Sequence, residues 1–79
     1  MRLGVTLFGP YAKLLPPRSE GGRTSVELRE PATLEQVLDH LGVPEGGRTY
    51  VTVNGRRVEL ASAVTEGDEI RVIVPLGGG

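Results

Sequence analysis

A chain of 79 residues suffices for one small domain, and such a domain buries too little of its surface to enclose a deep active-site cavity. Nine basic and ten acidic residues are interspersed and give a net charge of −1, whereas binding to a nucleic-acid backbone needs a basic face. The sequence has no cysteine and a single histidine, His40, which excludes a disulfide framework, a catalytic thiolate and a histidine metal cluster.

The N-terminal segment and the apolar runs bear on where the protein works. Residues 1–10 lack the apolar stretch of a signal peptide, and no run approaches the roughly 18 apolar residues of a membrane span. We therefore expect a soluble cytoplasmic protein that has no membrane or nucleic-acid partner and no stably bound cofactor or metal.

The first third of the chain predicts two strands. Alternation of apolar and other residues over 2–8 is the period-two pattern of a half-buried strand. A short helical turn is expected over 11–15, where two prolines stop it, and residues 18–22 form an exposed loop. Alternation resumes over 25–29, which predicts a second strand as the hairpin partner of the first.

One helix is predicted over Leu34 to Leu41. Thr33 followed by Gln36 matches a capping box, and the apolar residues of this segment recur on one helical face. Gly42 supplies the left-handed residue that ends many helices. We expect this helix to pack on the sheet.

The remaining segments predict a hairpin and a final strand. Residues 50–53 are expected to form a strand, Asn54-Gly55 is a strong hairpin-turn signal, and residues 56–58 are expected to form a brief return strand. The two arginines after the turn would form either a small basic contact patch or a solvated hairpin tip. Residues 60–64 read as an irregular or 3₁₀ connection. A Gly-Asp turn at 67–68 leads into the last strand, 70–74.

The order β-β-α-β-β-β predicts an α+β protein with the ubiquitin-like β-grasp fold, a mixed sheet of four to five strands packed on one main helix. In that plan the first and last strands lie side by side and parallel. We expect residues 1–76 to form this domain and residues 77–79 to be a flexible C-terminal glycine tail.

The tail is the most unusual feature of the sequence. Gly77, Gly78 and Gly79 contribute no side chain to a core and lose much conformational freedom if they become ordered. They would suit a thin lead that threads into a narrow site on another protein, with the terminal carboxylate of Gly79 as the reactive group. The alternative is a frayed terminus without a role.

Two other motifs have structural explanations. The segment Glu-Gly-Gly-Arg-Thr occurs at 20–24 and again at 45–49, each time before a predicted strand and not at the start of a helix, which favours turns over a phosphate site. Asp68 and Glu69 are adjacent carboxylates whose side chains point in different directions at a turn, so turn formation is expected rather than acid–base catalysis.

Apolar residues near the tail predict a docking surface. By alternation, Phe8 and Ile73 point away from the core, and Pro75 and Leu76 adjoin the tail. An apolar strip in this position would bind a partner, whereas isolated exposed apolar residues would have no function.

Several segments together resemble the MoaD/ThiS family of sulfur carriers. They are the opening Val5-Thr6-Leu7-Phe8-Gly9-Pro10, Val51-Thr52-Val53-Asn54-Gly55, Gly67-Asp68-Glu69-Ile70 and the closing Pro75-Leu76-Gly77-Gly78-Gly79. Each motif alone is weak, but their order and spacing cover nearly the whole chain. Gly77 departs from the pattern, because the family commonly has another residue before the final pair.

The resemblance implies a carrier rather than an enzyme, acting with an adenylating enzyme or as the small subunit of a synthase. A ubiquitin-activating-type adenylyltransferase would use ATP and magnesium to adenylate the Gly79 carboxylate. A sulfur donor, such as a desulfurase or a rhodanese-like protein, would then displace AMP. The resulting thiocarboxylate would deliver sulfur to a synthase subunit.

The pathway and the class of function stay open at this point. The long loop before the second strand favours a molybdopterin-type carrier over a thiamine-type one. A ubiquitin-like modifier would instead join Gly79 to lysines of target proteins. A β-grasp interaction module would carry the tail without using it.

Overall fold

The computed structural model describes residues 1–15 and 21–73. None of the helices within these residues is long and apolar enough to span a membrane. The elements run in the order β1 (Arg2–Leu7), the 3₁₀ helix η1 (Gly9–Leu14), β2 (Arg23–Glu27), β3 (Ala32–Thr33), α1 (Leu34–Leu41), the 3₁₀ helix η2 (Glu45–Arg48), β4 (Val51–Val53), β5 (Arg56–Arg57), β6 (Ala63–Val64) and β7 (Glu69–Val72).

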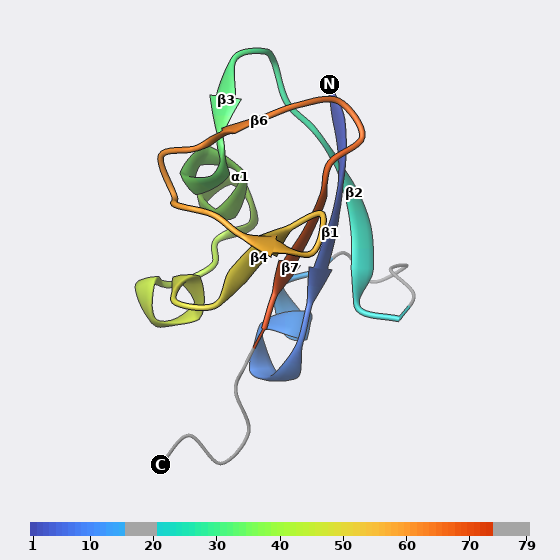
Figure 1. The fold of residues 1–79 in the computed structure, drawn as a ribbon. Coiled ribbons are helices and arrows are strands. Elements are labelled where there is room, and N and C mark those ends of the chain that lie inside the picture. The colour runs from blue at the N-terminus through green and yellow to red at the C-terminus, as the bar shows by residue number, and fades with distance from the viewer. Residues whose placement is uncertain (16–20, 74–79) are drawn as a thin grey trace.

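A five-stranded mixed sheet forms the centre of the molecule, with the strand order β2-β1-β7-β4-β5 (Figure 1). The first and last strands pair in parallel, from Gly4 beside Glu69 to Leu7 beside Val72. Strand β4 joins the other edge of β7 in antiparallel orientation. This arrangement confirms the predicted β-grasp plan, including the parallel neighbours at its centre.

Helix α1 has the predicted bounds, and its ends are formed by the predicted residues. The Thr33 hydroxyl accepts a hydrogen bond from the Gln36 backbone N–H, while the Gln36 side chain accepts one from the Thr33 N–H, at 3.3 and 2.8 Å. Gly42 ends the helix in the left-handed conformation with φ +76°. Both signals are local, which is why the sequence located this helix well.

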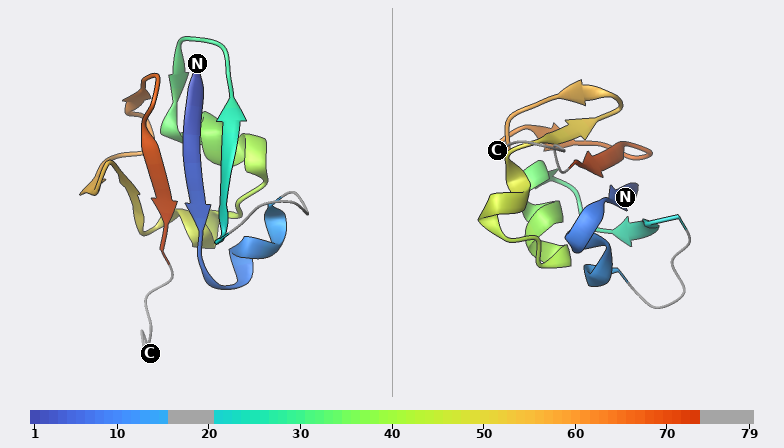
Figure 2. Two further views of the ribbon diagram at one scale, coloured as in Figure 1. Left: turned by 90° about the vertical axis from the view of Figure 1, so that its right-hand side faces the viewer. Right: turned by 90° about the horizontal axis from the view of Figure 1, so that it is seen from below.

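Helix α1 covers one face of the sheet (Figure 2). The core lies between them, where alternate residues of the central strands meet the apolar side of the helix. Its fully buried side chains include Leu3, Val5, Leu7, Leu34, Val37, Leu38, Ile70 and Val72. The residues between them on each strand point to the opposite side, which we call the outer face.

The structure corrects two predictions. Residues 63–64 form a strand, β6, that pairs with β3 in a separate two-stranded sheet, where an irregular connection was expected. A two-residue strand is too short to show alternation, and its partner is distant in sequence. Residues 45–48 form a 3₁₀ helix, although the second Glu-Gly-Gly-Arg-Thr segment was expected only to turn.

Candidate functional site

Three exposed apolar side chains lie side by side at one end of the sheet. Ile73 directly follows β7, Phe8 directly follows β1, and Tyr50 directly precedes β4. The pairing of Leu7 with Val72 and of Val51 with Val72 places these three residues in the next register position. We call them the apolar row.

Backbone hydrogen bonds hold the apolar row together. The Phe8 N–H donates to the Val72 carbonyl at 3.2 Å, and the Ile73 N–H donates to the Tyr50 carbonyl at 2.9 Å. Phe8, Tyr50 and Ile73 are 43%, 44% and 40% exposed, whereas the neighbouring residues Leu7, Val51 and Val72 are at most 2% exposed. Because neighbours along a strand point to opposite faces, the row belongs to the outer face.

The exposure of Phe8 and Ile73 confirms what alternation predicted for them, while their role in docking stays a prediction. Tyr50 was missed, because it was read as the first residue of an apolar strand. The same alternation rule, counted back from Val51, would have placed Tyr50 on the outer face.

Arginines border the apolar row on this face. Arg71 lies two residues before Ile73 and therefore on the same face, and both Arg71 and Arg57 pair with Thr52 of β4, which lies between them. The Arg57 guanidinium lies 5.0 Å from the centre of the Tyr50 ring and donates to the Thr49 carbonyl at 2.9 Å. This cation–π contact and hydrogen bond fix the tyrosine beside the hairpin. A partner surface would therefore meet apolar side chains beside positive charge.

Further from the row, an ion pair crosses the outer face above Gly4. Arg23 of β2 donates to both carboxylate oxygens of Glu69 at the start of β7, at 2.6 and 3.2 Å. A Cβ on Gly4 would collide with both partners, so the glycine makes room for the pair. The hydrogen bond from Arg23, assisted by its charge, lowers the pKa of Glu69 despite some desolvation.

The turn before β7 is organised by Asp68. Its carboxylate accepts hydrogen bonds from the Thr65 N–H at 2.8 Å, the Thr65 hydroxyl at 3.2 Å and the Asn54 side chain at 2.9 Å. Desolvation acts to raise the pKa of Asp68, but these hydrogen bonds outweigh it and lower the pKa. Asp68 therefore forms the turn as predicted, whereas Glu69 serves the cross-strand ion pair.

A surface hollow of about 330 Å³ is lined by Glu35, Glu45, Arg48, Thr49 and Leu60. Arg48 is already paired with Asp39 at 2.7 Å and with the Val43 carbonyl at 2.9 Å. Its charge is therefore satisfied within the protein. Among residues 1–15 and 21–73, no three His, Asp or Glu side chains are grouped to hold a metal.

The other predicted site residues lie outside the described residues. They are Pro75 and Leu76 of the predicted docking surface and the tail, Gly77, Gly78 and Gly79. Their roles stay predictions. The last described residue, Ile73, belongs to the apolar row and directly precedes this segment.

Three solved structures share the β-grasp fold. SAMP1 from Haloferax volcanii is 24% identical in sequence, with a TM-score of 0.73 over 100% of both chains. A candidate molybdopterin converting factor, subunit 1, from Pyrococcus furiosus is 19% identical, with a TM-score of 0.71 over 95% of this chain and 98% of that one. H. volcanii small archaeal modifier protein 1 is 23% identical, with a TM-score of 0.67 over 89% of this chain and 92% of that one.

These identities support a common fold and no more. The comparison with curated proteins gave no match. The ThiS family model, however, matches residues 5–79, which include both the apolar row and the glycine tail. This chain therefore belongs to the ThiS family.

Proposed function

We propose that this protein is a sulfur carrier, in which an activating enzyme adenylates the Gly79 carboxylate and a sulfur donor converts it to a thiocarboxylate. The pathway that we propose is molybdopterin biosynthesis in the cytoplasm. The observation that carries the proposal is the position of the apolar row. Ile73 is six residues from Gly79, so a partner bound to the row would have the terminal carboxylate within reach of an extended chain, about 20 Å away.

The chemistry explains why a carrier needs such a partner. An α-carboxyl group has a pKa of about 3.5 and is ionised at neutral pH, which makes it a poor acyl donor. Adenylation replaces a poor leaving group by AMP. Sulfide that attacks the acyl carbon displaces AMP and gives the thiocarboxylate directly. A persulfide displaces AMP to give an acyl disulfide, whose S–S bond a thiol of the sulfur donor then reduces to release the thiocarboxylate. ATP and magnesium belong to the activating enzyme in this scheme. The carrier supplies the carboxylate and the surface that positions it.

The outer face fits the docking step of this proposal. Its apolar row has the aromatic and aliphatic side chains that commonly anchor protein interfaces, and Arg57 and Arg71 add positive charge beside them. Glycines 77–79 would pass through a channel too narrow for a Cβ. The likeness to a candidate molybdopterin converting factor, subunit 1, supports the choice of pathway. Thiamine-type sulfur transfer is the nearest alternative.

The proposal is tested by intact-mass analysis. The protein is incubated with ATP, magnesium, its cognate adenylating enzyme and a sulfur donor. We expect a mass gain equal to the exchange of one oxygen for sulfur. Gly79→Val is the matched control, since it should fold normally and fail to be adenylated. An unchanged mass with an active partner, or normal activation of Gly79→Val, would contradict the proposal.

A ubiquitin-like modifier is the second candidate function. It is favoured by the likeness to a protein named as a small archaeal modifier. The two functions differ in their products, because a modifier forms an amide with a lysine of a target, whereas a carrier releases its sulfur and is regenerated. Slowly migrating conjugates that disappear when Gly78 and Gly79 are deleted would identify the modifier.

A further inference from the structure

The chain is poor in amines. Lys13 is the only lysine, and the other basic side chains are arginines. A guanidinium remains protonated in proteins and does not act as an acyl acceptor, whereas an amine does so when it loses its proton. The amines of this chain are therefore the α-amino group of Met1 and the side chain of Lys13.

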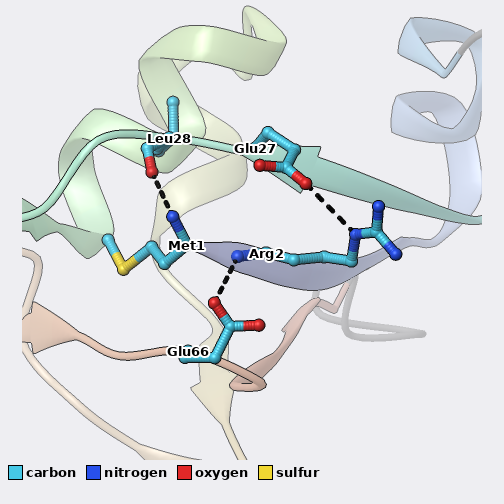
Figure 3. Close-up of polar contacts among 5 residues, drawn as sticks. All are labelled: Met1, Arg2, Glu27, Leu28 and Glu66. Carbon is cyan, nitrogen blue, oxygen red and sulfur yellow. Dashed lines mark hydrogen bonds and ion pairs between the residues drawn. The ribbon is translucent and has the colours of Figure 1, made fainter.

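The Met1 amine is held in the sheet. It donates a hydrogen bond to the Leu28 carbonyl at 2.7 Å (Figure 3). The Leu28 N–H in turn donates to the Met1 carbonyl at 3.0 Å. The next residue is fixed as well, since the Arg2 N–H donates to Glu66 at 2.8 Å and the Arg2 side chain pairs with Glu27 at 3.3 Å. Met1 is also half-buried, whereas an acyl group needs open access to the nitrogen that it acylates.

Lys13 is placed differently. It lies in the last turn of η1, its side chain is exposed, and within residues 1–15 and 21–73 it forms no ion pair. Helix η1 follows Phe8 directly, so Lys13 in its last turn is near the end of the sheet that carries the apolar row. The N-terminus of the chain is at the opposite end (Figure 1).

We propose that Lys13 is an acyl-acceptor site, to which the activated C-terminal carboxyl of a second copy of this chain is transferred in preference to the Met1 amine. The inference rests on the proposed function for its source of activated carboxyl groups. The neutral Lys13 nitrogen attacks the acyl carbon, a C–N bond forms, and the bond to AMP or to a thiol breaks. The proton of the amine passes to water, and the product is an isopeptide-linked pair.

This preference opposes the usual order of reactivity. As a class, α-amino groups are less basic than lysine amines, so a larger fraction is neutral near pH 8 and ready to react. An unhindered α-amine would therefore compete well for the acyl group. The fold reverses this order of reactivity, because the Met1 amine is hydrogen-bonded to Leu28 whereas the Lys13 amine is exposed.

The test separates donor from acceptor and needs no activating enzyme. The donor is the full chain carrying Lys13→Arg and a C-terminal thioester of a small thiol, so it cannot react with its own Lys13. The acceptor is the ¹⁵N-labelled wild-type chain at pH 8. Trypsin cleaves after Arg71, so an acylated Lys13 keeps residues 72–79 of the donor as a branch that mass spectrometry identifies.

We expect the branch mainly on Lys13, with less acylation of Met1, because the Met1 amine is half-buried and hydrogen-bonded. The Lys13→Arg acceptor should lose most of the conjugate. In denaturant, where the sheet is absent, Met1 should become a main acceptor. An Arg71→Lys acceptor should gain a second branched site, since this change turns an exposed guanidinium into an amine.

Two results would overturn the inference. One is Met1 as the main acceptor in the folded chain, and the other is an unchanged conjugate yield with the Lys13→Arg acceptor. Neither depends on the proposed function, because the donor is activated chemically. If instead the adenylating enzyme fails to activate the wild-type chain, the proposed function is contradicted while the preference for Lys13 can still be observed.

Discussion

The two ends of the five-stranded sheet are built in opposite ways. At one end, side-chain and backbone hydrogen bonds tie Asn54, Thr65 and Asp68 together, and the Met1 amine is bound to Leu28. At the other end, Phe8, Tyr50 and Ile73 expose apolar surface. At the first end, polar groups form hydrogen bonds that fix the chain. At the second end, which includes the last described residue, apolar side chains are exposed to solvent. Under the proposed function, the first end contributes stability and the second recognises the partner.

The largest expected effect is at the apolar row. Ile73→Asp would place a carboxylate in the centre of the row and should weaken binding to the activating enzyme by about 30-fold or more, since central interface residues contribute 2 kcal/mol or more. The melting temperature should hardly change, because Ile73 is already 40% exposed. Calorimetric titration measures the affinity, and thermal unfolding checks the fold.

Leu14→Asp is the matched control, because Leu14 is 39% exposed but lies on η1, outside the row. It should bind nearly as well as the wild type. Equal losses from both variants would mean that the row has no special role in docking.

The next largest effect is expected at the end of the sheet where Asn54, Thr65 and Asp68 are hydrogen-bonded. Asp68→Ala removes the acceptor of three hydrogen bonds and should lower the free energy of unfolding by about 1–2 kcal/mol. Binding to the activating enzyme should be unchanged. Chemical denaturation measures the loss, and Glu59→Ala, which removes an exposed carboxylate, is the control. Weaker binding without lower stability would reverse the roles assigned to the two ends.

Two carboxylates at the same end of the sheet, Asp68 and Glu69, should make the stability depend on pH. The pKa values of Asp68 and Glu69 are lowered in the folded state, so both groups stabilise the fold when ionised. That contribution is present above the unfolded-state pKa values and should be lost as the pH falls from about 5 through the folded-state values. Denaturation curves between pH 7 and 3 measure it, and Asp68→Ala should flatten the profile. A wild-type curve as flat as that of the variant would refute this assignment.

The smallest effect is expected at Gly4. Gly4→Ala should displace the ion pair between Arg23 and Glu69, so the pKa of Glu69 should rise toward its ordinary value with a slight loss of stability. NMR titration of the Glu69 carboxyl group follows this change. Ser25→Ala, an exposed position that pairs with Gly4, is the control and should leave that titration unaltered.

Much of the fold could be predicted because its signals are local. The capping box at Thr33, the left-handed Gly42 and the Asn54-Gly55 turn depend on residues within a few positions of each other. The pairing of β3 with β6 depends on two residues at each of two distant places, and no periodic pattern reveals it. The sequence was therefore informative about helices and turns but not about this short sheet.

The candidate site was predicted in part for the same reason. Alternation placed Phe8 and Ile73 on the outer face, and the family resemblance indicated the tail. Tyr50 and its contact with Arg57 depend on how β4 pairs with β7 and β5, which is a property of the sheet register. The space that Gly4 leaves for Arg23 and Glu69 likewise exists only once three strands are adjacent.

The parallel pairing of β1 with β7 has a consequence for biosynthesis. The centre of the sheet joins the first strand of the chain to the last, so it can close only after almost the whole chain has left the ribosome. Phe8, Ile73 and Tyr50 adjoin three separate strands and become neighbours only at that moment. A partner that recognises all three would thereby distinguish finished molecules from nascent or damaged ones before committing ATP to them.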